Sequence, residues 1–206
     1  MVNNLQAFLA GWDKGHIDAD ELLRSAEAAF PSASREDLIA AVEAVARSSF
    51  SPASSCAAAA LCRMHGLGDP LETAFELHNR SADLLTEPQW FLAIVGYGYN
   101  WICNAGLVCC YLDFGDRQFA DRIRVHEAIR AHAAAQVLRE ADLLFGPEGP
   151  PATQSERQAR TSDAVWAGMK QLSPRFWACG DEIFTRAYLY ALEHPGDFAG
   201  PGRGRS

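Results

Sequence analysis

Histidine and cysteine are the residues of this chain that could carry out nucleophilic or metal chemistry. The histidines are His16, His65, His78, His126, His132 and His194, and the cysteines are Cys56, Cys62, Cys103, Cys109, Cys110 and Cys179. A thiol next to an imidazole can act as a nucleophile, so Cys109 with His126 or His132 is the pair to consider. However, neither residue type shows a metal-binding or redox spacing such as HExxH or CxxC, and a thiol in apolar surroundings is usually inert. We therefore predict a protein that is not an enzyme, with no metal site and no cofactor.

A short segment near the N-terminus matches part of a calcium-binding loop. Gly15 and Glu21 fit the second half of an EF-hand loop, whereas Ala10, Trp12 and Lys14 stand where carboxylate ligands are needed. Because too few oxygen ligands are present, we expect a corner between two helices at this place. The sequence also contains no GxSxG motif, no P-loop and no GxGxxG fingerprint.

Residues 90–112 form the most apolar stretch, without a carboxylate, amine, guanidinium or imidazole. Its length would suit a membrane span, but Asn100 and Asn104 lie at its centre and three glycines interrupt it. We predict instead two buried helices joined around residues 100–106. The two asparagine amides should bond backbone groups that the bend leaves unpaired, and Gly106 should permit an unusual backbone angle or a close helix approach.

The elements that must position any site are helices. Apolar residues recur at helical spacing, and almost no segment alternates as a strand would, so we predict an all-α fold, a compact multi-helix bundle of about nine to ten helices. Capping boxes predict helix starts at Ser34 and Thr86, and we expect one helix over residues 155–172 and a separate short one from Ser173. Breaks in the pattern divide the chain into an N-terminal subdomain (residues 1–68), a second helical domain (69–198) and a disordered tail (199–206).

Arg122, His126 and Arg130 recur at every fourth residue within a predicted helix. Such a basic stripe is typical of a solvated helix face, and contact with a partner or an anion is the alternative.

The net charge of −8 is unevenly distributed. Residues 1–116 carry fifteen acids and six bases, whereas residues 117–206 carry eleven acids and twelve bases. An acidic surface repels nucleic acid and attracts basic proteins, so we expect no direct binding of DNA or RNA. The carboxylates that we select as a candidate partner-binding surface, called the acidic set below, are Asp69, Glu72, Glu76, Asp83 and Glu87.

Several segments of the second half stand in an order that resembles a known family. They are Asn104-Ala-Gly106-Leu, the turn Asp113-Phe-Gly115, residues 127–141, and the ending in which Tyr190, His194, Pro195 and Phe198 match a Tyr-x-x-x-His-Pro-x-x-Phe pattern. Over about residues 85–198 the chain is similar to the C-terminal domain of the bacterial DNA-mimic-protein family, otherwise a domain of unknown function. Asn100, Cys103 and Ala105 depart from that family's pattern, which has Glu, Asn and Gly at these positions.

The resemblance implies an all-helical, non-enzymatic protein that is often a homodimer. One member of that family uses surface carboxylates to occupy the DNA-binding face of a transcription regulator, which implies a basic DNA-binding regulator as the partner. Asn100 and the matching residues Asn104, Gly106, Tyr190, His194, Pro195 and Phe198 would then be structural.

Three functions fit these observations. The first is an acidic interaction protein that sequesters a basic DNA-binding regulator by charge complementarity. The second is an immunity-type protein that neutralises a toxin, and the third is an unrecognised small-molecule binder or hydrolase with its site near Asn100 and Asn104. The first residues lack the basic and apolar regions of a signal peptide, so we expect a cytoplasmic protein that does not bind membranes.

Overall fold

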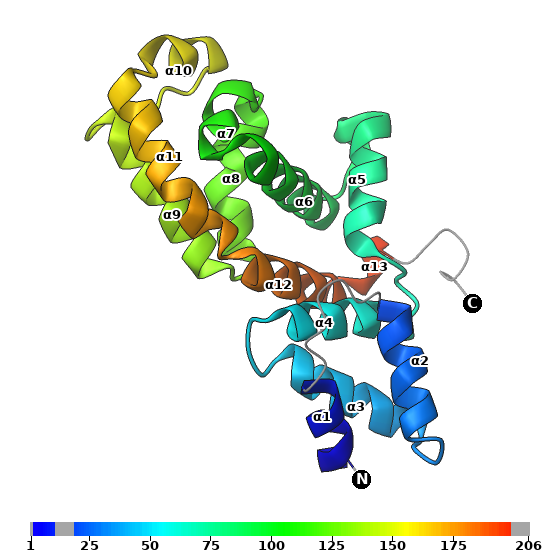
Figure 1. Ribbon diagram of the computed structural model, residues 1–206. Helices are drawn as coiled ribbons and strands as arrows, with labels where there is room; N and C mark the ends of the chain where they lie inside the picture. The colour runs from blue at the N-terminus through cyan, green and yellow to red at the C-terminus, as the bar shows by residue number, and fades with distance from the viewer. Residues whose placement is uncertain (1, 11–18, 199–206) are drawn as a thin grey trace. The chain divides into compact units, whose positions relative to one another are not determined.

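The computed structural model describes residues 2–10 and 19–198 (Figure 1). The loop around Gly15 and the predicted tail lie outside these residues. The described residues form thirteen α-helices and two 3₁₀ helices and contain no β-strand, so the predicted all-α fold is confirmed. The predicted number of helices was too low, because short helices such as α10 (Gln154–Arg160) and α13 (Pro195–Phe198) have too few residues to show a periodic pattern.

The chain forms two compact units. Unit 1 is built from the described residues of Met1–Thr73 and Phe184–Ser206, and unit 2 from Ala74–Ile183. Unit 1 contains α1 (Val2–Ala10), α2 (Ala19–Ala29), α3 (Arg35–Ala46), α4 (Pro52–Met64) and α13. Unit 2 contains α6 (Glu87–Ala105), α7 (Leu107–Asp113), α8 (Asp116–Ala128), α9 (His132–Asp142), α10 and α11 (Asp163–Trp177). Helices α5 (Pro70–Ser81) and α12 (Gly180–Glu193) each contain a boundary between the units.

Unit 1 differs from the predicted N-terminal subdomain because the end of the chain belongs to it. Leu189 of α12 is buried in the same apolar core as α2, α3 and α4. The Cys62 thiol donates a hydrogen bond to the carbonyl of Tyr188 (3.3 Å), and the hydroxyls of Ser55 and Thr185 lie 3.0 Å apart. These contacts join residues more than 120 positions apart, which local sequence signals do not reveal.

The predicted C-terminal motif, Tyr190, His194, Pro195 and Phe198, lies at the end of α12 and in α13, within unit 1. Nδ1 of His194 lies 2.9 Å from the carbonyl oxygen of Tyr190, and the two rings lie 4.2 Å apart. Pro195 begins α13, a position where its missing N–H has no helical partner to lose. Phe198 at the end of α13 is buried. The four residues thus lie where α12 ends and α13 follows.

Capping boxes start the helices that the sequence marked. The Ser34 hydroxyl accepts a hydrogen bond from the Asp37 N–H (3.1 Å), and the Asp37 carboxylate accepts one from the Ser34 N–H (3.3 Å). Thr86 and Gln89 form the equivalent arrangement at the start of α6. Both predictions are confirmed because the pattern depends only on residues three positions apart.

The predicted helix pair of residues 90–112 is present in unit 2 as α6 and α7. The two helices meet at Gly106 with a bend of 116°. In the described part of the chain no single helix is long and apolar enough to cross a membrane, and only this bent pair, taken together, passes that test. Residues 90–95 of α6 are all buried, so the apolar stretch forms the interior of unit 2.

The basic stripe of α8 is not solvated as predicted. Arg122 and His126 are only 6% and 4% exposed, and Arg130 alone of the three is exposed. Arg122 donates hydrogen bonds to the carbonyl of Phe119 (2.6 Å) and to the Asp142 carboxylate. The prediction was wrong because the spacing of charges along a helix does not show whether that face will pack against a half-buried carboxylate such as Asp142.

Arg157 is a second buried arginine, and it fastens α10 to the end of α7. Its guanidinium donates to the carbonyls of Tyr111 (2.9 Å), Phe114 (2.7 Å) and Ala152 (2.5 Å). The carbons at the centres of the Arg122 and Arg157 guanidinium groups lie 3.5 and 3.8 Å from the centroid of the Phe119 ring. Cation–π attraction and carbonyl acceptors together compensate for removing these charges from water.

Helix α11 differs from the prediction at both ends. The helix expected over residues 155–172 is divided, since α10 ends at Arg160 and Ser162 caps a new helix by accepting from the Val165 N–H. Pro174 lies inside α11 and begins no new helix. Helix α11 therefore extends to Trp177 and brings Ser173 and Trp177 to the bend between α6 and α7.

Candidate functional site

The bend between α6 and α7 is held by a glycine and a serine. Gly106 has φ +85° and ψ 164°, a region of backbone conformation that is essentially restricted to glycine. The next residue, Leu107, donates its backbone N–H to the Ser173 hydroxyl (2.9 Å), which in turn donates to the Met169 carbonyl (2.9 Å). The buried serine thus joins the bend to α11 and satisfies the backbone group that the bend releases.

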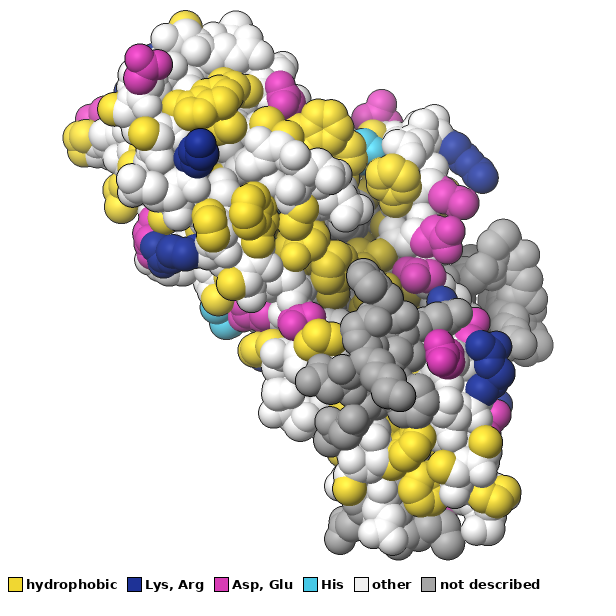
Figure 2. Space-filling view, viewed as in Figure 1, with side chains coloured by type: hydrophobic (Ala, Val, Ile, Leu, Met, Phe, Trp, Pro, Cys, Tyr) yellow, Lys and Arg dark blue, Asp and Glu magenta, His cyan; other side chains and the backbone are white. Residues whose placement is uncertain are grey.

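A cavity of about 400 Å³, called the tryptophan cavity below, opens between this bend and α11. It is lined by Cys103, Asn104, Ala105, Gly106, Val108, Trp166, Lys170, Ser173 and Trp177. The four residues from α11 are spaced at i, i+4, i+7 and i+11, which places them along one face of the helix. Figure 2 shows hydrophobic side chains gathered over α6, α7 and α11, with basic side chains among them.

The two tryptophans form much of the apolar wall. Trp166 is 49% exposed and Trp177 is 42% exposed, although indole rings of this size are usually more buried. The Trp177 indole N–H donates to the carbonyl of Ile102 (3.2 Å), and the Tyr99 hydroxyl donates to the carbonyl of Trp177 (3.3 Å). One wall of the cavity is therefore anchored to α6 before any ligand arrives.

The polar groups of the cavity are few. Lys170 supplies a positive charge, and it forms no ion pair within the described residues. The Asn104 amide and the Cys103 thiol are exposed, and no carboxylate lines the cavity. Because both hydrogen-bonding directions of Ser173 are already used, its hydroxyl is not a free nucleophile. An apolar concave lining with a few polar groups is the kind of surface that binds small ligands.

The prediction for the two asparagines was wrong. Both Asn100 and Asn104 are exposed, and the backbone N–H at the bend is bonded by Ser173 instead. The prediction for Gly106 is confirmed by its positive φ. Sequence reasoning missed Ser173 because a serine inside a helix gives no signal of a partner 66 residues away. Asn104 is one of the residues that line the tryptophan cavity, whereas Asn100 does not line it.

The predicted thiol–imidazole pair is not formed as a catalytic unit. The Cys109 thiol donates to the carbonyl of Ala105 (3.2 Å), and burial together with the nearby Asp113 raises its pKa. His126 is buried, its Nδ1 faces the carbonyl of Arg122 (2.6 Å), and burial lowers its pKa to about 4. His132 is exposed. A raised thiol pKa disfavours the thiolate that a nucleophilic cysteine requires.

Asp69 and Glu72, the first two members of the acidic set, lie at the start of α5. The Asp69 carboxylate accepts hydrogen bonds from the N–H groups of Leu71 (3.1 Å) and Glu72 (3.2 Å), and from the Tyr188 hydroxyl (3.3 Å). Asp69 therefore serves as a helix cap, while Glu72 is exposed. Only one of these two carboxylates is presented freely to solvent.

The other three members of the acidic set are each next to an arginine. Nitrogen–oxygen distances are 3.6 Å for Glu76 with Arg80, 3.8 Å for Asp83 with Arg117 and 3.0 Å for Glu87 with Arg124. Figure 2 shows acidic side chains over α5 with basic and hydrophobic ones beside them. Local arginines thus reduce the negative field that a phosphate-like array would need.

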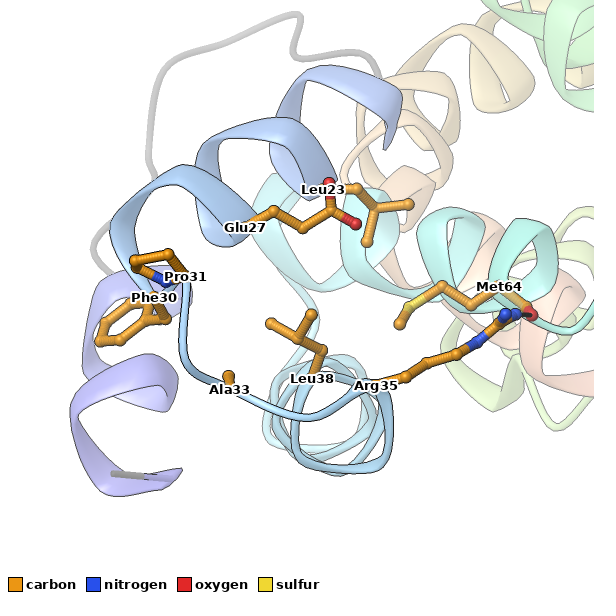
Figure 3. A pocket seen from close by; sticks show the side chains of 8 residues that line it. All are labelled: Leu23, Glu27, Phe30, Pro31, Ala33, Arg35, Leu38 and Met64. Carbon is orange, nitrogen blue, oxygen red and sulfur yellow. Dashed lines mark hydrogen bonds between the residues drawn. The ribbon is translucent and has the colours of Figure 1, made fainter.

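A second cavity, of about 450 Å³, lies in unit 1 (Figure 3). It is lined by Leu23, Glu27, Phe30, Pro31, Ala33, Arg35, Leu38 and Met64. Figure 3 shows Arg35 extended toward Met64, whose carbonyl oxygen accepts its hydrogen bond at 2.5 Å. Glu27 and Arg35 are the two charged residues of an otherwise apolar lining, and Arg35 is held by the Met64 carbonyl.

Within the residues that the structure describes, no group of three or more His, Cys, Asp or Glu side chains is placed to hold a metal ion. Comparisons of the chain with protein-family models, with curated proteins and with solved structures found no match.

Proposed function

We propose that this protein is a non-enzymatic binding protein and that the tryptophan cavity of unit 2 is its recognition site. The observation that carries the proposal is the combination of two partly exposed indole rings, Trp166 and Trp177, with the positive charge of Lys170 around one concave space. Ligand sites are mostly apolar cavities with a small number of orienting polar groups. Exposed tryptophans are also the residues that contribute most strongly to binding when a partner covers them.

Binding is favoured over catalysis by the state of the possible reactive groups. Ser173 is engaged in two hydrogen bonds, and the pKa of the Cys109 thiol is raised by burial. Cys103 is exposed at the cavity, but the cavity lining contains no histidine or carboxylate that could act as its base. A hydrolase would need such a base within hydrogen-bond reach of its nucleophile.

The exposed Cys103 provides a direct test of where a ligand binds. Members of a library of small organic molecules would be scored for raising the thermal unfolding temperature, and each positive compound would then be tested for slowing iodoacetamide alkylation of Cys103. Cys56 of unit 1, a half-buried thiol outside the cavity, is the internal reference in the same peptide mass measurement. We expect protection of Cys103 alone, and weaker protection in the variants Trp166→Ala and Trp177→Ala.

The variant Trp101→Ala is the matched control, because Trp101 is an exposed tryptophan of α6 that does not line the cavity. Stabilising compounds that leave Cys103 unprotected, or that bind both tryptophan variants as well as the wild type, would show that recognition takes place elsewhere.

A second candidate function is sequestration of a basic DNA-binding regulator, and the uneven charge distribution is the observation that favours it. Association led by charge should slow steeply as salt rises. Neutralising the acidic set together should reduce the association rate with a basic partner captured from the native organism. A captured partner whose binding is insensitive both to salt and to these changes would favour the immunity-type alternative, in which shape dominates.

A further inference from the structure

We infer that the ligand of the tryptophan cavity is a small aromatic carboxylate of one or two rings, an inference that rests on the function proposed above. The cavity lining carries a net positive charge. Lys170 is its one charged residue, and no aspartate or glutamate lines the cavity. On α11 itself, the residues three and four positions from Lys170 are Trp166, Ala167, Ser173 and Pro174, so no carboxylate is in reach of its ammonium group along the helix. An anion is the ligand charge that this lining complements.

The placement of the two indole rings favours a ligand that contains an aromatic ring system. Trp166 precedes Lys170 by four residues and Trp177 follows it by seven, so Lys170 stands between the two tryptophans along one helix face. Indole rings interact favourably with other rings by offset stacking or edge-to-face contact. A ligand whose flat body contacts the indoles would bring an attached acid group to Lys170.

Asn104 supplies the second polar contact for such an acid group. Its amide is exposed at the end of α6 and lines the same cavity. A carboxylate has two oxygen atoms, and one ammonium group with one amide N–H₂ group provides a donor for each. A cavity of about 400 Å³ is near the lower end of the range for ligand sites, which suits a ligand of one or two rings.

The bend argues against a phosphate group as the anion. Phosphates are commonly bound by free backbone N–H groups or by arginine forks. Of the first three backbone N–H groups of α7, that of Leu107 is bonded to Ser173 and that of Cys109 to the carbonyl of Gly106 (3.1 Å), which leaves at most the N–H of Val108 for a ligand. No arginine lines the cavity. A single lysine and an amide match one carboxylate better than a doubly charged phosphate.

The test compares matched probes by isothermal titration calorimetry on the full chain. Naphthoate, naphthamide and naphthylmethylamine share one ring system and differ in carrying a carboxylate, a neutral amide or an ammonium group. Cyclohexanecarboxylate and inorganic phosphate keep the anion without the aromatic rings. We expect naphthoate to bind roughly tenfold more tightly than naphthamide, with the cationic amine and inorganic phosphate weakest.

Variants separate the two parts of the inference. Lys170→Met should reduce naphthoate affinity to that of naphthamide, while Trp166→Ala and Trp177→Ala should weaken both compounds. Arg175→Met removes a positive charge from the same helix outside the cavity, where Arg175 pairs with Glu140, and should leave the preference for naphthoate unchanged.

Each alternative outcome has a defined meaning. Equal affinity for naphthoate and naphthamide, weakened by both tryptophan substitutions, would overturn the carboxylate assignment and leave the binding function standing. Cyclohexanecarboxylate or phosphate binding as tightly as naphthoate would overturn the aromatic assignment. Absence of binding by every probe would overturn the assignment of ligand class, and the Cys103 protection experiment would then decide separately whether the cavity binds at all.

Discussion

Unit 2 should lose stability in mild acid because His126 is buried in its neutral form. Nδ1 of His126 lies 2.6 Å from the carbonyl oxygen of Arg122, so it carries the ring proton and donates a hydrogen bond. Among the residues that the structure describes, buried Nε2 has no hydrogen-bond partner, and the ring of Phe176 meets the imidazole edge-on at 5.8 Å. Burial lowers the pKa of His126 to about 4, and the hydrogen bond to the Arg122 carbonyl opposes this only in part.

The direction of the pH effect follows from this lowered pKa. In the unfolded chain His126 takes up a proton near its ordinary pKa of 6.5, whereas in the folded protein it does so only near 4. The group has little effect on stability above its unfolded pKa, and it destabilises the fold as the pH falls from 6.5 toward 4. Integrating this difference from pH 7 to pH 5 predicts a loss of about 2 kcal/mol in the free energy of unfolding from His126 alone.

The measurement is urea unfolding, followed by circular dichroism, of the wild type and of His126→Phe at both pH values. Phenylalanine retains a flat ring and cannot titrate, so contributions from the other ionisable groups cancel when the two pH-dependent losses are subtracted. The wild type should lose about 2 kcal/mol more than the variant between the two pH values. Equal losses would refute the conclusion that the buried imidazole stays neutral.

Four further substitutions test the bend and the buried arginine, each by the free energy of unfolding in urea. Ser173→Ala should cost about 1–3 kcal/mol, because it strands the buried N–H of Leu107. Asn104→Leu should change stability by no more than about 0.5 kcal/mol, since the amide is exposed. Gly106→Ala should cost about 1–3 kcal/mol because of its positive φ, although the space would accept a methyl group. Arg157→Met should cost about 3–5 kcal/mol by leaving buried carbonyls without donors, and a loss below 1 kcal/mol would contradict that role.

The fold could be predicted where the signal was local. The capping boxes at Ser34 and Thr86 and the break at Gly106 each depend on a few neighbouring residues, and all three are present. The return of α12 to unit 1 could not be predicted, because it depends on contacts such as that between Cys62 and Tyr188. Division of the long helix before Ser162 also escaped prediction, since residues on both sides have helical propensity.

The sequence drew attention to part of the cavity lining but not to the residues that supply its rings and its charge. Residues around Asn104 and Gly106 were identified from their polarity within an apolar stretch, and they do line the tryptophan cavity. Trp166, Lys170 and Trp177, which supply the aromatic rings and the positive charge of the cavity, lie about sixty or more positions later in the sequence. Their spacing could have been seen as one helix face, but nothing local indicates that this face meets the bend.

The strained glycine and the cavity can be understood as consequences of the same turn. Because α6 and α7 meet at 116°, the backbone at the bend cannot continue its helical hydrogen bonds, and the Leu107 N–H requires a partner from outside the two helices. Ser173 provides that partner, which brings α11 against the inner side of the bend. Lys170 and Trp166, one and two turns earlier on α11, then lie along the same face as Ser173, with the bend opposite them. A straight helix over residues 87–113 would need neither Ser173 nor the positive φ of Gly106, and it would offer α11 a convex surface with no space to enclose a ligand.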